Sequence, residues 1–174
     1  EEIGVGEGEG YSVNIPLPPG TYNDIYLQTF SDVVVPLMNA FAPDFIVLEL
    51  GADALAGDPL AHIKLTNQVY SKILNILMDA DIPLLVSGGG GYHVENTVRA
   101  WSLAWSVMIG EHDDMEAMNF GLGGVMLETT DWMGGFQDRE LPVTDEQKHT
   151  VDPEVQQSIN KVRELIFPIH GIEK

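Results

Sequence analysis

Two loops of this sequence carry residues that could do chemistry. The first runs from Gly51 to Leu60 and places the carboxylate of Asp53 among small residues, directly after an apolar run. Small neighbours let other groups approach closely, so Asp53 could ligate a metal ion. The alternative is that Asp53 or Asp58 only shapes a turn by accepting backbone N–H bonds, and Asp58, before Pro59, is the better turn former.

The second loop is the run of four glycines from Gly88 to Gly91, which Tyr92 follows. Glycines allow backbone conformations that other residues rarely adopt, and the phenol after them could face a ligand. Because the ordinary pKa of a phenol is about 10, it stays protonated at neutral pH and can donate a hydrogen bond to a developing oxyanion. The alternative is a loop tyrosine that is half-buried for packing.

Other chemistries are poorly supported. Neither Gly4–Gly10 nor Gly88–Gly91 has the Lys-Ser/Thr ending of a phosphate-binding P-loop, or a G-x-G-x-x-G in proper order between a strand and a helix. The chain has no cysteine, and Ser87 lacks the surroundings of a nucleophilic serine. The five histidines show no i, i+4 pair, so a self-contained zinc site is not expected, and His93 is expected on the surface.

Strands and helices alternate around the two loops. Phe45–Leu50 and Pro83–Ser87 are apolar runs of strand length, and apolar residues recur at helical spacing between them, after a cap at Thr66. This order predicts a parallel sheet. Loops that leave the carboxyl ends of parallel strands open onto one edge, where ligands bind in open α/β sheets. Asp53 and Tyr92 both lie on such loops, which nominates that edge as a site.

Periodicity also predicts elements outside this core. We expect a short strand at 11–15, a helix at 22–41 that Pro36 should perturb, a helix at 94–109, and a last helix at 153–166 with Asp152 as its cap.

Composition limits the function classes. The 174 residues are 44% hydrophobic, which suits one globular domain, and the net charge of −19 with eight Lys and Arg argues against direct nucleic-acid binding. The acidic surface could steer cationic substrates, although solubility is the simpler account. The apolar runs are far shorter than the roughly 20 residues that a membrane helix needs. A cysteine-free chain that begins Glu1-Glu2, without an export signal, is expected to be a cytoplasmic fragment.

Three segments in order resemble the zinc-dependent histone deacetylase superfamily: 8–17, 51–60 and 88–92. Together with Arg99-Ala100-Trp101 they cover about the first 110 residues, and the expected subgroup is bacterial, similar to acetoin utilisation proteins and acetylpolyamine amidohydrolases. The resemblance implies an arginase-like α/β fold, a three-layer, mostly parallel sheet flanked by helices. Residues 1–174 would then be the C-terminal part of a single catalytic domain.

The resemblance also implies roles for the residues. Asp53 matches the second aspartate of a zinc site built from two aspartates and a histidine, and Tyr92 matches the tyrosine that hydrogen-bonds the acyl carbonyl. Leu60 matches a residue of the tunnel wall. Gly90 and Gly91 match glycines beside the acetyl pocket, and the carbonyl of Tyr11 matches a ligand of a structural potassium ion.

The same resemblance shows what this sequence lacks. The family's histidine pair and Asp-x-His ligands would precede residue 1, so we expect this polypeptide alone to be inactive and to need the missing N-terminal half as a partner. The implied substrate is acetyl-lysine in protein or a small acetylated amine. An apolar face left by the missing half would also permit a homo-oligomer. The competing hypothesis is a non-catalytic α/β module that binds a small ligand or a partner chain.

Overall fold

A computed structural model describes residues 2–111 and 136–173. Contacts divide the chain into two compact units, one formed by Glu1–Asp44 with Val143–Lys174 and the other by Phe45–Pro142. No helix in the described part of the chain is long and apolar enough to cross a membrane.

The first unit is helical. Its elements are η1 (Gly6–Gly8), α1 (Asn23–Thr29), the π-helical η2 (Phe30–Val34), α2 (Val35–Phe41), α6 (Asp145–Leu165) and η3 (Phe167–His170). The helix expected at 22–41 is confirmed as the continuous run α1–η2–α2. Proline lacks the N–H that closes a helical hydrogen bond. The perturbation expected at Pro36, in the first turn of α2, is observed as the π-helical η2 just before it.

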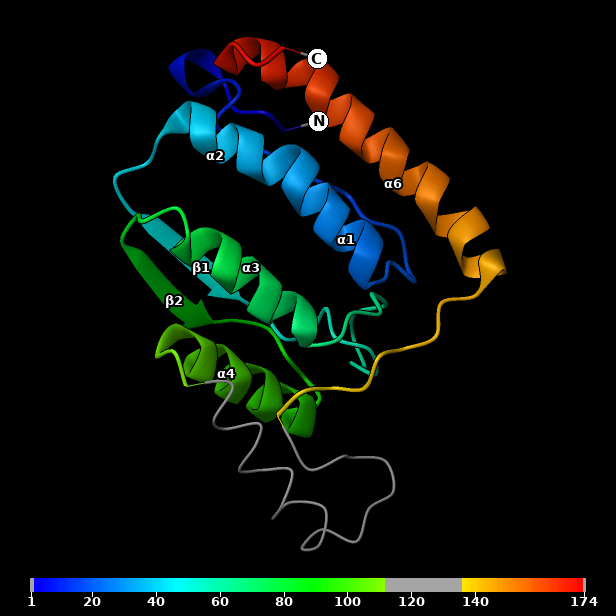
Figure 1. Ribbon diagram of the computed structural model, residues 1–174. Helices are drawn as coiled ribbons and strands as arrows, with labels where there is room; N and C mark the ends of the chain where they lie inside the picture. Colours follow the sequence, from blue (N-terminus) through cyan, green and yellow to red (C-terminus); the bar gives the residue numbers. More distant parts are fainter. Residues whose placement is uncertain (1, 112–135, 174) are drawn as a thin grey trace, which may run out of the picture. The chain divides into compact units, whose positions relative to one another are not determined.

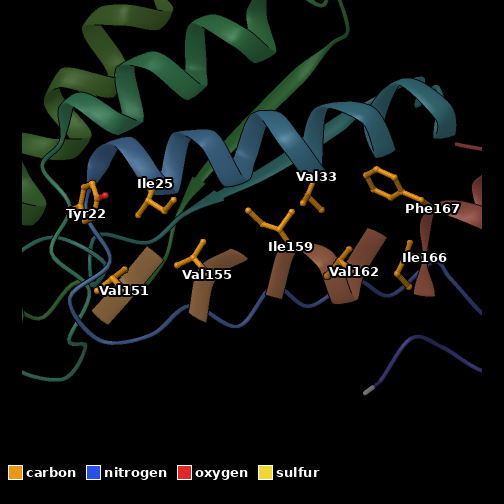
Figure 2. Packing of buried hydrophobic residues seen from close by; sticks show 9 residues of the cluster. All are labelled: Tyr22, Ile25, Val33, Val151, Val155, Ile159, Val162, Ile166 and Phe167. Carbon is orange, nitrogen blue, oxygen red and sulfur yellow. The ribbon is translucent and has the colours of Figure 1, made fainter. Parts of the chain in front are cut away.

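Helix α6 packs along α1 and η2 within this unit (Figure 1). Figure 2 shows the side chains that fill the space between them, and all are buried: Tyr22, Ile25, Val33, Val151, Val155, Ile159, Val162, Ile166 and Phe167. Each fully buried Val or Ile contributes about 1.5–3 kcal/mol relative to an exposed one. This core holds the two ends of the sequence together in one unit.

The start of α6 differs from the expectation of a helix at 153–166 capped by Asp152. The helix begins at Asp145, and Thr144 caps it by accepting a 3.1 Å hydrogen bond from the N–H of Gln147. Pro153 lies inside the helix because buried contacts by Val151 and Val155 hold the chain helical on both sides of it.

The strand expected at 11–15 is also wrong, because the structure has no strand there. The segment has alternating side chains but no neighbouring strand to pair with among the described residues. The preceding loop is closed by the N–H of Gly10, which donates to the carbonyl of Ile3 at 2.6 Å, and the N–H of Tyr11 donates to the carbonyl of Gly8 at 3.2 Å.

The second unit contains β1 (Ile46–Leu50), α3 (Gln68–Met78), β2 (Leu84–Gly88) and α4 (Val94–Met108). The two strands pair in parallel, with Ile46 opposite Leu84 and Leu50 opposite Gly88 (Figure 1). The strand–helix–strand order predicted from the sequence is therefore confirmed. Helices α3 and α4 pack against each other, and their buried residues include Leu74 and Leu103.

The cap expected at Thr66 is not the one that forms. Helix α3 follows Asn67, whose backbone N–H donates to Oδ2 of Asp138 at 2.9 Å. The backbone N–H of Asp138 in turn donates to Oδ1 of Asn67 at 2.9 Å, and Arg99 pairs with Oδ1 of Asp138 at 2.8 Å. A carboxylate from a distant segment thus satisfies the start of α3 and ties it to α4.

Candidate functional site

The parallel pairing brings the ends of β1 and β2 together. The backbone N–H of Ala52 donates to the carbonyl of Gly90 at 2.5 Å, which joins the loop after β1 to the loop after β2. Two helix side chains bind carbonyls where the first strand ends: Trp101 Nε1 donates to Leu50, the last strand residue, at 2.8 Å, and the Tyr70 hydroxyl donates to Gly51, the next residue, at 2.6 Å. The two loops nominated by the sequence therefore form one connected edge.

Asp53 lies against the glycine run. A Cβ atom on Gly90 would come within 2.7 Å of both Cγ and Oδ2 of Asp53, so a larger residue here would displace the carboxylate from this position. Asp53 is partly exposed, and no hydrogen bond to its carboxylate comes from the described residues. Its oxygen lone pairs are therefore available, which fits one ligand position of a zinc ion.

The described residues do not complete a metal site. Among residues 2–111 and 136–173, no three His, Asp or Glu side chains gather in a group that could hold a metal ion. A catalytic zinc ion needs three protein ligands and an open position. Asp53 can supply one of the three.

Tyr92 combines an anchored backbone with an exposed side chain. Its backbone N–H donates to Oδ2 of Asp58 at 2.8 Å, whereas 56% of the residue is exposed. The preceding Gly91 has φ +144°, and a Cβ on it would come within 2.5 Å of Thr97 Oγ1 and 2.9 Å of the Ala52 Cβ. Because the Tyr92 side chain is largely exposed, packing among the described residues does not hold the phenol in place. The phenol is therefore able to approach a ligand.

Asp58 has the turn-forming role that the sequence suggested and a second role that it did not. Oδ1 accepts the N–H groups of Leu60 at 2.8 Å and Ala61 at 3.1 Å, while Oδ2 accepts that of Tyr92. Burial alone would raise the pKa of this carboxyl, but these backbone hydrogen bonds and one from His93 outweigh it and lower the pKa. The sequence showed only the Asp-Pro turn, and nothing in it indicated the bond to the second loop.

Leu60 and Tyr11, the two remaining residues that the sequence nominated, lie in different parts of the structure. Leu60 is 63% exposed and follows Asp58 in the first loop. Tyr11 belongs to the first unit, where its ring contacts Phe41 and His170 edge-on at centroid distances of 5.9 and 5.1 Å. Its assignment to a potassium site stays a prediction.

His93 has a role that sequence reasoning missed. It is partly buried rather than fully on the surface, and it precedes α4 as its N-cap, where Nδ1 accepts the N–H of Asn96 at 3.4 Å. The signal for this role was its place immediately before a predicted helix.

Comparisons of this sequence with a family model and with known proteins all point to the same family. Residues 1–108 match the sequence model of the histone deacetylase domain. Histone deacetylase 8 of Xenopus laevis is 38% identical over 109 residues, which cover 63% of this chain and 34% of that protein. Histone deacetylase HDAC1 of Drosophila melanogaster is 38% identical over 108 residues, covering 62% and 21%. The chain spans about a third or less of the length of these relatives.

The crystal structure of the HDA15 HD domain is similar over nearly the whole chain. The TM-score is 0.70 at 26% identity, and the match covers 98% of this chain and 39% of that one. This likeness confirms the predicted fold class, a partial α/β domain of the arginase/deacetylase kind. The finer bacterial subgroup stays a prediction.

Proposed function

Because the chain belongs to the histone deacetylase family, we propose that it supplies Asp53 and Tyr92 to a zinc-dependent deacetylase, as zinc ligand and as hydrogen-bond donor to the acyl oxygen. The observation that carries this proposal is the 2.5 Å hydrogen bond from Ala52 to Gly90. It joins the loop of the carboxylate to the loop of the phenol at the edge where both strands end. The proposed substrate is acetyl-lysine in protein or a small acetylated amine.

In the proposed reaction, bound zinc would polarise the amide carbonyl and lower the pKa of a water molecule. The Tyr92 phenol would donate a hydrogen bond to the acyl oxygen, and this bond would strengthen as the carbon becomes tetrahedral and the oxygen gains charge. The exposed Leu60 side chain would line the wall beside the substrate, and Gly90 and Gly91 would leave space for the acetyl group. The Tyr11 carbonyl would help hold a potassium ion.

The rest of the machinery would come from a preceding segment, which would supply a histidine pair and the other two zinc ligands. Its proposed docking surface includes one face of the sheet, where Val47 and Leu85 pair in register and are 67% and 54% exposed. Burying such apolar surface is favourable. The 174-residue polypeptide alone is therefore expected to be inactive, and zinc-dependent deacetylation by it in pure form would contradict this expectation.

Acetate release by the full-length protein that carries this chain tests the proposal. The substrates are an acetyl-lysine peptide and an acetylated diamine, each assayed before chelation, after chelation, and after zinc is returned. We expect acetate from at least one substrate, loss of release with chelator, and recovery with zinc. No release from either substrate would count against a deacetylase and favour a non-catalytic binding module.

A further inference from the structure

One buried carboxylate binds both loops of the candidate site. Asp58 is 9% exposed, and its two oxygens divide their hydrogen bonds between the loops. Oδ1 accepts the N–H groups of Leu60 and Ala61, at 2.8 and 3.1 Å, within its own loop. Oδ2 accepts the N–H of Tyr92, 34 positions later, at 2.8 Å. Each oxygen therefore fixes the backbone of a different strand's loop.

The groups that contact the Asp58 oxygens are backbone N–H donors, so this position requires a side chain that only accepts hydrogen bonds. An ionised carboxylate offers acceptor sites on both oxygens, whereas an amide of the same shape has one acceptor and one donor group. With asparagine at this position, one loop would keep its acceptor and the other would face an N–H₂ group. A buried N–H left without an acceptor costs free energy, so the two loops would no longer be held together by the same side chain.

The N–H of Tyr92 is the point at which this restraint matters most. The residue before it is a glycine with φ +144°, and the Tyr92 side chain itself is 56% exposed. Neither feature by itself fixes the direction in which the phenol leaves the loop. The hydrogen bond to Asp58 fixes the point from which the phenol leaves the loop, because it sets the position of the Tyr92 peptide relative to the peptide of Leu60.

We propose that Asp58 is a positioning residue, which holds the oxyanion donor Tyr92 and the wall residue Leu60 in a fixed relation through their backbones. This inference rests on the proposed function. Asp58 acts through Tyr92 and does not touch the substrate. Misplacement of a reacting group by about 1 Å can cost about 100-fold in rate, so the loss of this anchor should lower kcat strongly while zinc remains bound.

The test uses kcat and KM of the full-length protein with Asp58→Asn, Tyr92→Phe and both changes together. If Asp58 acts through the phenol, Asp58→Asn should lower kcat by about 100-fold in the normal background. The same change should lower kcat little further when Tyr92 is already Phe, since coupled residues are not additive. The matched control is Asp138→Asn, a carboxylate that bonds Asn67 and Arg99 instead of the two loops. It should lower the melting temperature and leave kcat near normal.

The outcomes separate this inference from the function on which it rests. Unchanged turnover in Tyr92→Phe would overturn the donor role of Tyr92 in the proposed function, and absence of acetate release would overturn the deacetylase function itself. A strong Tyr92→Phe effect, with no loss from Asp58→Asn or with the same loss in both backgrounds, would overturn only the positioning role.

A second substitution decides the question if Asp58→Asn does not fold. Replacing Tyr92 by its α-hydroxy analogue turns its backbone N–H into an ester oxygen and leaves both side chains unchanged. The positioning role requires kcat to fall in that protein, and normal kcat would overturn it.

Discussion

The carboxylate of Asp53 lies so close to the backbone of Gly90 that a methyl group on the glycine would come within 2.7 Å of Cγ. The two residues belong to loops that follow neighbouring strands, and the hydrogen bond from Ala52 to the carbonyl of Gly90 holds those loops together. The glycine therefore sets where the proposed zinc ligand can lie.

Gly90→Ala should displace the Asp53 carboxylate and weaken zinc binding. Changes to groups that orient a metal ligand typically cost about 10–100-fold in affinity, and we expect a loss of that size. Calorimetric titration of the metal-free, full-length protein with zinc measures it. Gly8→Ala is the control, because a Cβ there has no atom within 4 Å. Equal zinc affinity in both variants would show that Asp53 is not a ligand.

Tyr92→Phe should lower turnover by about 100-fold or more, because removal of one oxyanion donor costs this much in other enzymes. Zinc content and melting temperature should stay near normal, since the side chain is 56% exposed and the backbone bond to Asp58 remains. Steady-state kinetics with an acetyl-lysine peptide checks the prediction. Unchanged kcat would show that Tyr92 is not the oxyanion donor.

Asn67→Ala should destabilise the second unit. The Asn67 side chain is fully buried, accepts from the backbone of Asp138 and donates to the carbonyl of Phe136. Each buried partner left unpaired costs about 1–3 kcal/mol. Urea denaturation of the full-length protein measures the loss. Asn75→Ala, on the exposed side of the same helix, is the control and should be neutral or slightly stabilising, because alanine favours helix.

Stability should fall as the pH rises from about 10 to about 12. Burial, the hydrogen bond to Asp152 and the nearby carboxylates raise the pKa of Tyr22 from 10.0 to about 12. Between these values the folded state keeps a proton that the unfolded state loses, so the contribution is complete below pH 10 and disappears through this window. Tyr22→Phe should flatten this part of the stability–pH profile.

The matched change for that experiment is Asp152→Asn, which keeps an acceptor for the Tyr22 hydroxyl but removes the charge. It should move the loss of stability to lower pH. Urea denaturation at a series of pH values follows both variants. The same slope in the normal protein and in Tyr22→Phe would show that Tyr22 does not contribute.

Short-range patterns were sufficient to predict the elements around the site. The apolar runs near 46–50 and 84–88, with a helical repeat between them, specify β1, α3 and β2 within windows of a few residues. Parallel pairing then places Asp53 and Tyr92 on adjacent loops. The family was also identifiable, because its motifs stand in order within the segment that matches the histone deacetylase domain.

Contacts between distant residues could not be predicted in this way. Asp138 binds the backbone N–H of the N-cap Asn67 from 71 positions away, and α3 begins one residue later than a cap at Thr66 would give. Buried contacts keep α6 helical through Pro153, although proline is common at the first position of a helix and therefore predicted a helix start there. The bond from Tyr92 to Asp58 depends on two loops that meet only after the sheet has formed. Each case is decided by tertiary packing, which overrides local preference.

The pairing of β1 with β2 has a consequence for how this polypeptide would fold. Within the described residues the sheet has two strands, so each strand has a strand partner on one side only. Isolated two-stranded sheets are marginally stable, and open edges recruit further strands, including those of other molecules. Any further strand that pairs with this sheet would therefore add to its stability and close one of the edges through which copies of the chain could associate.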